Sequence, residues 1–373
     1  MAAPSGPDCG ATELYIGLMT GTSLDGVDAV LADCAGVPPR TLAHDHRPLP
    51  APLRAELLAL NTPGADEIHR AHLAGLDLAR LYAESVAALL RTSGVQAPAV
   101  RAIGAHGQTV RHRPDLGYTV QLNAPALLAE LSGIDVVADF RSRDVAAGGH
   151  GAPLVPAFHR VAFHHDEPRA VVNVGGISNI TALTGSKVLG FDAGPGNVLI
   201  DAWMASRFGL PFDAGGQLAA TAAPDEAFVT SLLAERFFAA TPPKSTGRDL
   251  FTLDWVLAHP PARKLAPEVV LSSLTALTAR AIAEAIDRWL PEAREVIVCG
   301  GGARNATLMR LLQARLRSRR VCASDTFGIP ADQVEALAFA WLAQCHVRRL
   351  AGNVPEATGA FGPRILGALY PAS

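Results

Sequence analysis

Hydrophobic residues recur along the chain in short runs of strand length, separated by glycine-rich turns and by longer segments with helical spacing. The first two runs, 14–19 and 27–31, flank a turn that ends in Asp25-Gly26, which predicts a β-hairpin. Leucines three and four residues apart predict helices over 51–61 and 66–93. Further strands are expected at 100–104, 119–122 and 134–138, and further helices at 125–132 and 153–163. Alternating strands and helices are typical of an α/β protein.

The same order of elements begins again after the polar segment His164–Pro168. Strands at 170–174 and 180–183 flank another glycine-containing turn. The remaining elements expected are strands at 188–191 and 295–299, and helices at 198–208, 225–239, 269–288, 306–316 and 332–349. This weak internal symmetry predicts two related domains, 14–168 and 169–373, after a disordered tail, 1–13, with helix 332–349 able to pack back on the first domain.

Composition narrows the class of protein. The chain has 373 residues, of which 49% are hydrophobic and 18% charged, so it can build sizeable cores and is not a disordered chain. Its formal net charge of −3 argues against nucleic acid or an anionic membrane as a partner. The five cysteines are far apart and include no Cys-x-x-Cys pair, which excludes a disulfide scaffold and a zinc ribbon.

The N-terminal residues have neither the basic nor the apolar segment of a secretory signal. The most apolar helical stretch, 269–286, is interrupted by Arg280 and Glu284, and no uncharged run approaches the roughly 18 residues that span a bilayer. We therefore expect a cytoplasmic protein with reduced thiols.

Three glycine-rich turns, at 20–26, 175–179 and 299–305, follow strands of the predicted sheets. Ligands in such sheets bind beyond the carboxyl ends of the strands, and glycines let backbone amides approach an anion closely. The first turn alone fits an ordinary hairpin equally well, but two such hairpins at matching places favour a phosphate clamp. The chain has no GxxxxGK and no GxGxxG motif, so neither a P-loop nor a dinucleotide site is expected.

Seven motifs together resemble one family, the anhydro-N-acetylmuramic acid kinases, in the family's order from about residue 14 to the C-terminus. They are Gly-Thr-Ser-Leu-Asp-Gly (21–26), Gly-Ala-His-Gly-Gln-Thr (104–109), Asp-Phe-Arg-Ser-Arg-Asp-Val-Ala-Ala-Gly-Gly (139–149), Asn-Val-Gly-Gly-Ile-Ser-Asn (173–179), Gly-Phe-Asp-Ala-Gly-Pro-Gly-Asn (190–197), Lys-Ser-Thr-Gly-Arg (244–248) and Val-Cys-Gly-Gly-Gly-Ala (298–303).

This resemblance implies two RNase H-like domains of the actin-like ATPase type that flank a nucleotide cleft. It implies an enzyme that uses ATP with Mg²⁺ to open the 1,6-anhydro ring of its sugar hydrolytically and to phosphorylate O6. The products would be N-acetylmuramate 6-phosphate and ADP, in the recycling of peptidoglycan. The sugar is then the small-molecule partner, and a homodimer is expected from the resemblance alone.

Asp192 is the candidate catalytic residue, because it ends an apolar strand and opens a turn whose proline and glycines keep bulk away from the carboxylate. Asp also caps helices and forms turns, which is the structural alternative. The resemblance makes Asp192 the general base. The candidate nucleotide-binding residues are Gly21, Thr22, Ser23, Leu24, Asp25, Gly26, Val27, Asp28, Gly175, Gly176, Ser178, Asn179, Gly300, Gly301 and Gly302.

Candidate sugar contacts are Gln108, Arg141, Arg143, Asp144 and Glu335. Arginine binds carboxylates through two parallel hydrogen bonds, although mixed charges are also common on solvated surfaces. Glu335 is included only because the family has a Glu there.

The histidines and lysines offer little further chemistry. The lone His106 is expected to be structural, and His44 and His46 to lie on the surface. Lys244 is the only lysine whose loop could face a nucleotide, and no metal-binding set of residues is expected.

Two other functions fit parts of the sequence. A glycoside hydrolase could use Asp192 with a second carboxylate, but the glycine-rich hairpins would then have no role. A non-catalytic, sugar-responsive ATP-binding module would leave the Asp192 turn unexplained.

Overall fold

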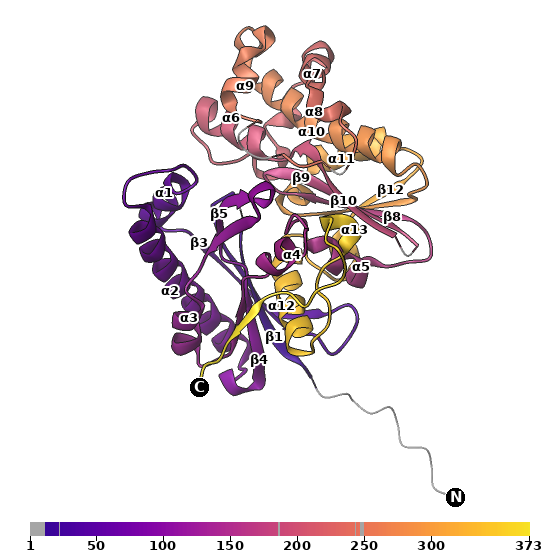
Figure 1. Ribbon diagram of the computed structural model, residues 1–373. Helices are drawn as coiled ribbons and strands as arrows, with labels where there is room; N and C mark the ends of the chain where they lie inside the picture. The colour runs from indigo at the N-terminus through magenta and orange to yellow at the C-terminus, as the bar shows by residue number, and fades with distance from the viewer. Residues whose placement is uncertain (1–11, 22, 186, 243, 247–249) are drawn as a thin grey trace, which may run out of the picture. The chain divides into compact units, whose positions relative to one another are not determined.

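The computed structural model describes residues 12–21, 23–185, 187–242, 244–246 and 250–373. The chain divides into two compact units, each built around one large β-sheet (Figure 1). Unit 1 consists of Met1–Ala147, Ala336–Gly352 and Arg364–Ser373, and unit 2 consists of Gly148–Glu335 and Asn353–Pro363. The last part of the chain therefore returns to unit 1 twice.

The strands of the unit 1 sheet are β1 (Leu14–Thr20), β2 (Gly26–Asp33), β3 (Arg40–Pro48), β4 (Val100–Ala105), β7 (Val136–Ala138) and β13 (Ala368–Tyr370). Their order is β13-β7-β4-β1-β2-β3. β1 is antiparallel to β2 and parallel to β4, and β2 is antiparallel to β3. β4 is parallel to β7, which is antiparallel to β13. A separate antiparallel ribbon consists of β5 (Gln108–Arg113) and β6 (Tyr118–Leu122).

Helices cover both faces of this sheet. α1 (Ala51–Ala59), α2 (Glu67–Ser93) and α3 (Pro125–Ser132) contribute leucines to a core shared with β1, β2 and β4. The part of α12 (Val334–Val347) that belongs to unit 1 lies against the opposite face, where backbone atoms of Ala336 and Phe339 approach β1 and β4. The short helix α4 (Ser142–Ala146) follows β7.

The strands of the unit 2 sheet are β8 (Arg169–Val174), β9 (Ile177–Thr184), β10 (Lys187–Pro195), β11 (Glu295–Cys299) and β12 (Arg320–Ala323), in the order β10-β9-β8-β11-β12. β8 and β9, and β9 and β10, are antiparallel, whereas β8, β11 and β12 run parallel. The helices are α5 (Val155–Phe163), α6 (Val198–Phe208), α7 (Glu226–Leu233), α8 (Arg236–Ala239), α9 (Leu253–Ala258), α10 (Pro267–Trp289), α11 (Ala306–Arg315) and α13 (Pro355–Thr358).

The two sheets share one topology. In unit 1 the first three strands form an antiparallel meander, β1-β2-β3, and β4 and β7 then add in parallel beside β1. In unit 2 the meander is β8-β9-β10, and β11 and β12 add in parallel beside β8. Both follow the order 3-2-1-4-5 of an RNase H-like sheet, so the expected pair of RNase H-like units is confirmed.

The apolar helix predicted at 153–163 packs with unit 2, not with unit 1. α5 contacts β8, β9 and β10, and the units divide between Ala147 and Gly148. The polar segment His164–Pro168 therefore joins a helix to a strand inside unit 2. Polarity predicts a boundary at residue 168, but polarity does not reveal which sheet a preceding helix covers.

The single helix predicted at 225–239 is wrong in detail. It is divided into α7 and α8 because Glu235 has an extended backbone, with ψ 132°. The strand β3 was not predicted, because its sequence of His, Asp and Arg lacks the apolar alternation of a strand.

α10 is long and apolar enough to span a membrane, but 83% of its most apolar window is buried inside the protein. Its leucines, isoleucines and alanines pack in two cores of unit 2, one with α6 and α7 and one with β8 and β11. The helix therefore serves as the central helix of this unit.

Candidate active site

Asp192 lies near the carboxyl end of β10, on the face opposite α10. Its neighbours Phe191 and Ala193 pack into the core with α10, so the alternation of the strand turns Asp192 to the other face. A β-bulge follows immediately, between Asp192 and Gly194. The carboxylate Oδ2 accepts a hydrogen bond of 2.9 Å from the backbone N–H of Thr246.

Burial raises the pKa of Asp192 to about 6, against the smaller opposing effects of the Thr246 hydrogen bond and the charge of Lys244. Among the described residues no cation lies within ion-pair distance of this carboxylate. Asp192 is therefore mostly ionised at neutral pH but is a stronger base than an ordinary aspartate.

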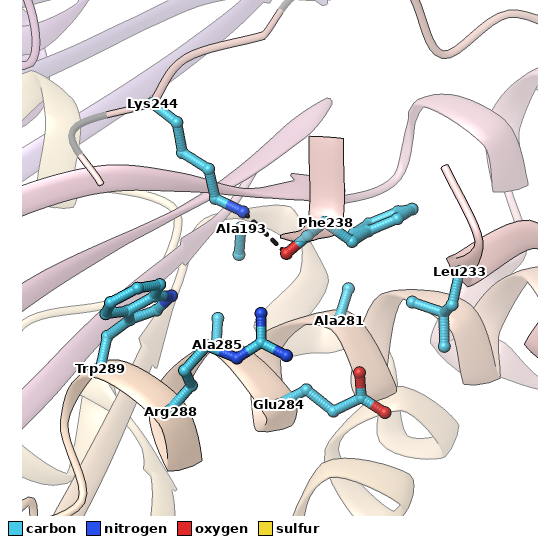
Figure 2. A pocket seen from close by; sticks show the side chains of 9 residues that line it. All are labelled: Ala193, Leu233, Phe238, Lys244, Ala281, Glu284, Ala285, Arg288 and Trp289. Atoms are coloured by element: carbon cyan, nitrogen blue, oxygen red, sulfur yellow. Dashed lines mark hydrogen bonds between the residues drawn. The ribbon is translucent and has the colours of Figure 1, made fainter. Parts of the chain in front are cut away.

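Lys244 does not present its ammonium group to the Asp192 carboxylate. Its Nζ donates hydrogen bonds to the carbonyl oxygens of Phe237 (2.9 Å) and Phe238 (3.3 Å), at the end of α8, and lies 4.5 Å from the centre of the Phe237 ring. Figure 2 shows the side chain reaching toward Phe238 across a pocket of about 20 Å³, which has room for a water molecule but not for a nucleotide. Burial lowers the pKa of Lys244, and the charge of Arg288 adds to the effect.

Lys244 thus caps the C-terminal end of α8 and holds in place the loop that supplies the Thr246 N–H. In the segment 243–249, Pro243, Gly247, Arg248 and Asp249 lie outside the described residues. The candidate nucleotide role of this loop stays a prediction.

The turn between β8 and β9 is joined directly to the turn after Asp192. The backbone N–H groups of Gly196 and Asn197 donate to the carbonyl oxygens of Gly176 and Gly175, both at 2.8 Å. The hydroxyl of Ser178 donates to the carbonyl of Gly194 at 3.0 Å. Asn179 lies opposite Asp192 in the β9–β10 ladder. The structure therefore brings these predicted residues together at one edge of the unit 2 sheet.

The three glycines after β11 have different surroundings. A Cβ on Gly302 would lie 2.3 Å from Cγ1 of Val174, and a Cβ on Gly300, whose φ is +78°, would lie 2.4 Å from Oδ1 of Asn173. Close packing against β8 thus accounts for both glycines. A Cβ on Gly301 would meet nothing nearer than Nδ2 of Asn197, at 3.6 Å. Only Gly301 therefore has a side open to a ligand.

Asn197 also belongs to this region, and it is not among the candidate residues predicted from the sequence. Its Nδ2 donates to the carbonyl of Val174 at 3.2 Å, and the same atom is the nearest neighbour of the open side of Gly301. It therefore connects the turns after β8, β10 and β11. Its place in the Asp-Ala-Gly-Pro-Gly-Asn motif was the available signal.

Glu335 lies in the first turn of α12, beside the carboxyl end of β11. Burial chiefly, and the charge of Glu335 in addition, raise the pKa of the Cys299 thiol. The carboxylate is thus near the glycines that follow Cys299 in unit 2. A sugar contact of Glu335 stays a prediction.

The turn between β1 and β2 in unit 1 is closed by its own residues. Leu24 has a left-handed backbone, with φ 57°, and its N–H donates to the carbonyl of Gly21 at 3.2 Å. Oδ1 of Asp25 accepts from the hydroxyl of Ser23 (2.6 Å) and from the N–H of Gly26 (3.0 Å). Thr22, the remaining hydroxyl of this predicted phosphate turn, lies outside the described residues.

Three residues predicted to bind nucleotide have side chains that already contact other parts of unit 1. The side chains of Leu24 and Val27 are buried in the core, so these two residues could bind a nucleotide only through their backbone groups. Asp28 accepts a 2.8 Å hydrogen bond from Nδ1 of His46 and lies 3.6 Å from Nε2 of His44. Their role at a nucleotide stays a prediction.

The predicted sugar contacts of unit 1 gather where β4 and β7 end. Nε2 of His106 accepts hydrogen bonds from Nε (3.1 Å) and Nη2 (2.8 Å) of Arg141. His106 is buried, and its backbone N–H donates to the carbonyl of Leu18 in β1. The contact joins segments that are 35 residues apart in sequence.

The other candidates of this region differ in exposure. Gln108 and Asp144 are buried, at 1% and 0% exposure, whereas Arg143 is exposed. Nε2 of Gln108 donates to the carbonyl of Thr109, while its Oε1 is buried with no hydrogen-bond partner. A buried acceptor of this kind is uncommon and marks a place where a water or ligand donor fits. Among the described residues no cluster of three or more His, Cys, Asp or Glu is arranged to hold a metal ion.

The chain is similar to known proteins of one family over nearly its whole length. The family model described as anhydro-N-acetylmuramic acid kinase matches residues 13–372. A protein of that name from Cupriavidus metallidurans is 54% identical over 380 residues, covering 99% of this chain and 100% of its own length. Another from Bordetella parapertussis is 57% identical over 366 residues, covering 96% of each chain.

Among solved structures, component A of the (R)-2-hydroxyglutaryl-CoA dehydratase of Acidaminococcus fermentans is 11% identical, with a TM-score of 0.49, and the alignment covers 88% of this chain and 96% of that chain. The family resemblance expected from the seven motifs is confirmed by the family model and by the two relatives. The chain belongs to the anhydro-N-acetylmuramic acid kinase family.

Proposed function

We propose that this chain uses ATP to open 1,6-anhydro-N-acetylmuramic acid with water and to phosphorylate its O6, giving N-acetylmuramate 6-phosphate and ADP. Membership of the family supports the substrates. The observation that carries the chemistry is Asp192, a carboxylate with a raised pKa at a strand end lined by small residues. The reaction fits the recycling of peptidoglycan in the cytoplasm.

Asp192 acts as the general base. It takes a proton from the water that attacks the anomeric carbon, the bond between that carbon and O6 breaks, and O6 takes the γ-phosphoryl group of ATP. A carboxylate whose pKa is about 6 is still mostly ionised at neutral pH, and it accepts a proton more readily than an ordinary Asp. The Thr246 N–H keeps one oxygen of the carboxylate oriented.

The glycine-rich turns bind the nucleotide. In unit 2 the open sides of Gly176 and Gly301 leave room for close approach of a ligand, since an added Cβ on Gly176 would meet nothing nearer than 4.0 Å. Ser178 and Asn179 fix the same turn. Mg²⁺ would enter with ATP, held mainly by phosphates and waters.

Arg141 receives the negatively charged lactyl group of the sugar, because a guanidinium matches a carboxylate with two hydrogen bonds. Arg143, Asp144, Gln108 and Glu335 are proposed to contact the remaining polar groups of the sugar.

The release of ADP tests this proposal. Purified protein should release ADP from Mg-ATP only when 1,6-anhydro-N-acetylmuramic acid is present, and one phosphorylated sugar should form per ADP. A hydrolase acting without ATP would open the sugar with no ADP release. An ATPase that is equally fast without sugar would also contradict the proposal.

A further inference from the structure

The residues predicted to bind the nucleotide carry no positive charge. Their charged members are Asp25 and Asp28, which are negative, whereas the phosphates of ATP are strongly anionic. In the motifs of unit 2, the Lys244 ammonium group donates to carbonyl oxygens of α8, Arg304 pairs with two aspartates at 3.1 Å, and Arg248 lies outside the described residues. A cation close to the predicted phosphate turn, in addition to Mg²⁺, would offset the charge of the phosphates.

Arg54 places a guanidinium group against the turn between β1 and β2. Its Nε donates a 2.9 Å hydrogen bond to the carbonyl oxygen of Leu24, inside the predicted phosphate turn. The backbone N–H of Leu49, just before α1, donates to the next carbonyl, that of Asp25, at 3.2 Å. Two consecutive carbonyls of the turn are therefore held by residues at the start of α1.

The packing of α1 fixes the point from which the Arg54 side chain extends. Leu53 and Leu57 of this helix are buried in the unit 1 core, which also contains Leu24. Arg54 follows Leu53 by one position, about 100° around the helix, and is exposed. Among the described residues no carboxylate forms an ion pair with Arg54. Its guanidinium has further N–H donors besides Nε, and these are accessible to a ligand.

We propose that Arg54 binds the phosphoryl groups of the nucleotide at the turn between β1 and β2. The bond from Nε to the Leu24 carbonyl orients the guanidinium, and its terminal nitrogens donate to the phosphate oxygens, a contact that suits this planar group. Arg54 thereby supplies a full positive charge where the amides of the turn supply only partial ones. The inference rests on the proposed function, in which this turn binds ATP.

Two substitutions separate the charge of Arg54 from its bond to the turn. Arg54→Gln keeps an amide donor for the Leu24 carbonyl but has no charge, whereas Arg54→Lys keeps the charge. In calorimetry, Arg54→Gln should bind a non-hydrolysable ATP analogue about tenfold more weakly, and Arg54→Lys should stay within about threefold of the unaltered protein. The affinity of Arg54→Gln should also depend less steeply on salt concentration, because the contact that salt screens is absent.

Arg70→Gln is the matched control. Nε of Arg70, in α2, lies 2.7 Å from a carboxylate oxygen of Glu56 in α1, so its charge is already paired beside the same helix. Its replacement removes one positive charge from this part of unit 1 and should change the affinity for the ATP analogue less than about twofold. Thermal unfolding shows whether each variant is folded, and Arg54→Met is a second neutral variant if Arg54→Gln does not fold.

The outcomes distinguish this inference from the proposed function. If the unaltered protein does not bind the ATP analogue, the proposed function fails together with the inference that rests on it. If the unaltered protein binds it and a folded Arg54→Gln variant binds it equally well, only the role of Arg54 is overturned. Weaker binding with an unchanged salt dependence, or an equal loss in Arg54→Lys or Arg70→Gln, would also overturn that role.

Discussion

Asp28 in unit 1 and Asp192 in unit 2 are carboxylates on strands of two sheets that share one topology, but they are stabilised differently. Asp28 lies on β2 beside two histidines of β3, and its Oδ1 accepts a 2.8 Å hydrogen bond from His46. Burial alone would raise the pKa of Asp28, but the two histidines, His46 through a hydrogen bond and His44 close by, outweigh it and leave that pKa below its ordinary value. The partner His46 has a raised pKa, chiefly because of its hydrogen bond to Asp28.

The Asp192 carboxylate has no such partner among the described residues, and it accepts a hydrogen bond from the backbone N–H of Thr246. Its pKa is raised to about 6, mainly by burial. The same residue type thus has a lowered pKa in one unit and a raised pKa in the other. The difference shows how strongly the polar partners of a buried carboxylate affect its pKa.

Replacing Asp192 should have the largest effect on activity. Asp192→Asn should lower kcat by about a hundredfold or more, because a general base contributes roughly 10²–10⁴-fold. The amide oxygen still accepts the Thr246 N–H, so the local structure and the affinity for ATP should be retained. Steady-state ADP release measures the first, and calorimetry with a non-hydrolysable ATP analogue measures the second. Turnover near the original rate would remove Asp192 from the role of base.

The pH dependence of the rate tests the same base without a mutation. A base must be unprotonated to act, and the pKa of Asp192 is about 6, so kcat/KM for the sugar should fall about tenfold per pH unit below pH 6 and level off above it. An ordinary aspartate, with a pKa near 4, would keep full activity down to about pH 5. The residual rate of Asp192→Asn should lack this limb. If the limb persists in that variant, another group titrates.

Two glycines of unit 2 separate the needs of packing from the needs of ligand binding. Gly176→Ala meets open space and should leave thermal unfolding nearly unchanged, while it weakens ATP about tenfold if the Cβ obstructs a phosphate. Gly302→Ala is the matched control, since its Cβ would lie 2.3 Å from Val174 and should lower the unfolding temperature. Unchanged ATP affinity in a folded Gly176→Ala variant would exclude this turn from the nucleotide site.

Most strands and helices followed from the sequence, because apolar runs and leucine spacing report burial directly. The hairpin β1–β2, the helix α3 and the strand β11 were predicted within a residue or two of their ends. The strand β3 was missed because its buried side is small and its other residues carry charge. Edge strands of this kind are held by pairing with a neighbour, which a local pattern does not contain.

The sequence motifs predicted which residues are candidates for the site, but not the contacts that these residues make. The motifs supplied Asp192 and the glycine turns as candidates, but they could not show that the Lys244 ammonium group donates to carbonyl oxygens at the end of α8. Nor could it distinguish Gly302, which packing requires, from Gly301, which packing leaves open. His106 and Arg141 are 35 residues apart in sequence, so their contact exists only once β4 and β7 lie side by side.

The smallest expected effect concerns stability and has opposite signs at the two carboxylates. The fold favours protonated Asp192, so its stabilising contribution is complete below the unfolded pKa, near 4, and is lost as the pH rises through about 6. Asp192→Asn should therefore raise the free energy of unfolding by about 1–3 kcal/mol at pH 8 and by about half as much at pH 5.

At Asp28 the partly exposed pair with His46 works in the other direction. The raised pKa of His46 means that the pair contributes fully below pH 6.5 and is lost as the pH rises through the folded pKa of His46. Asp28→Asn should thus lower the free energy of unfolding by only about 0.2–1 kcal/mol at pH 6, and by less at pH 8. Urea unfolding of both variants at pH 5, 6 and 8 compares the two trends. If Asp192→Asn were destabilising at pH 8 to the same degree as Asp28→Asn at pH 6, both carboxylates would be structural, and the assignment of a poised base to unit 2 would fail.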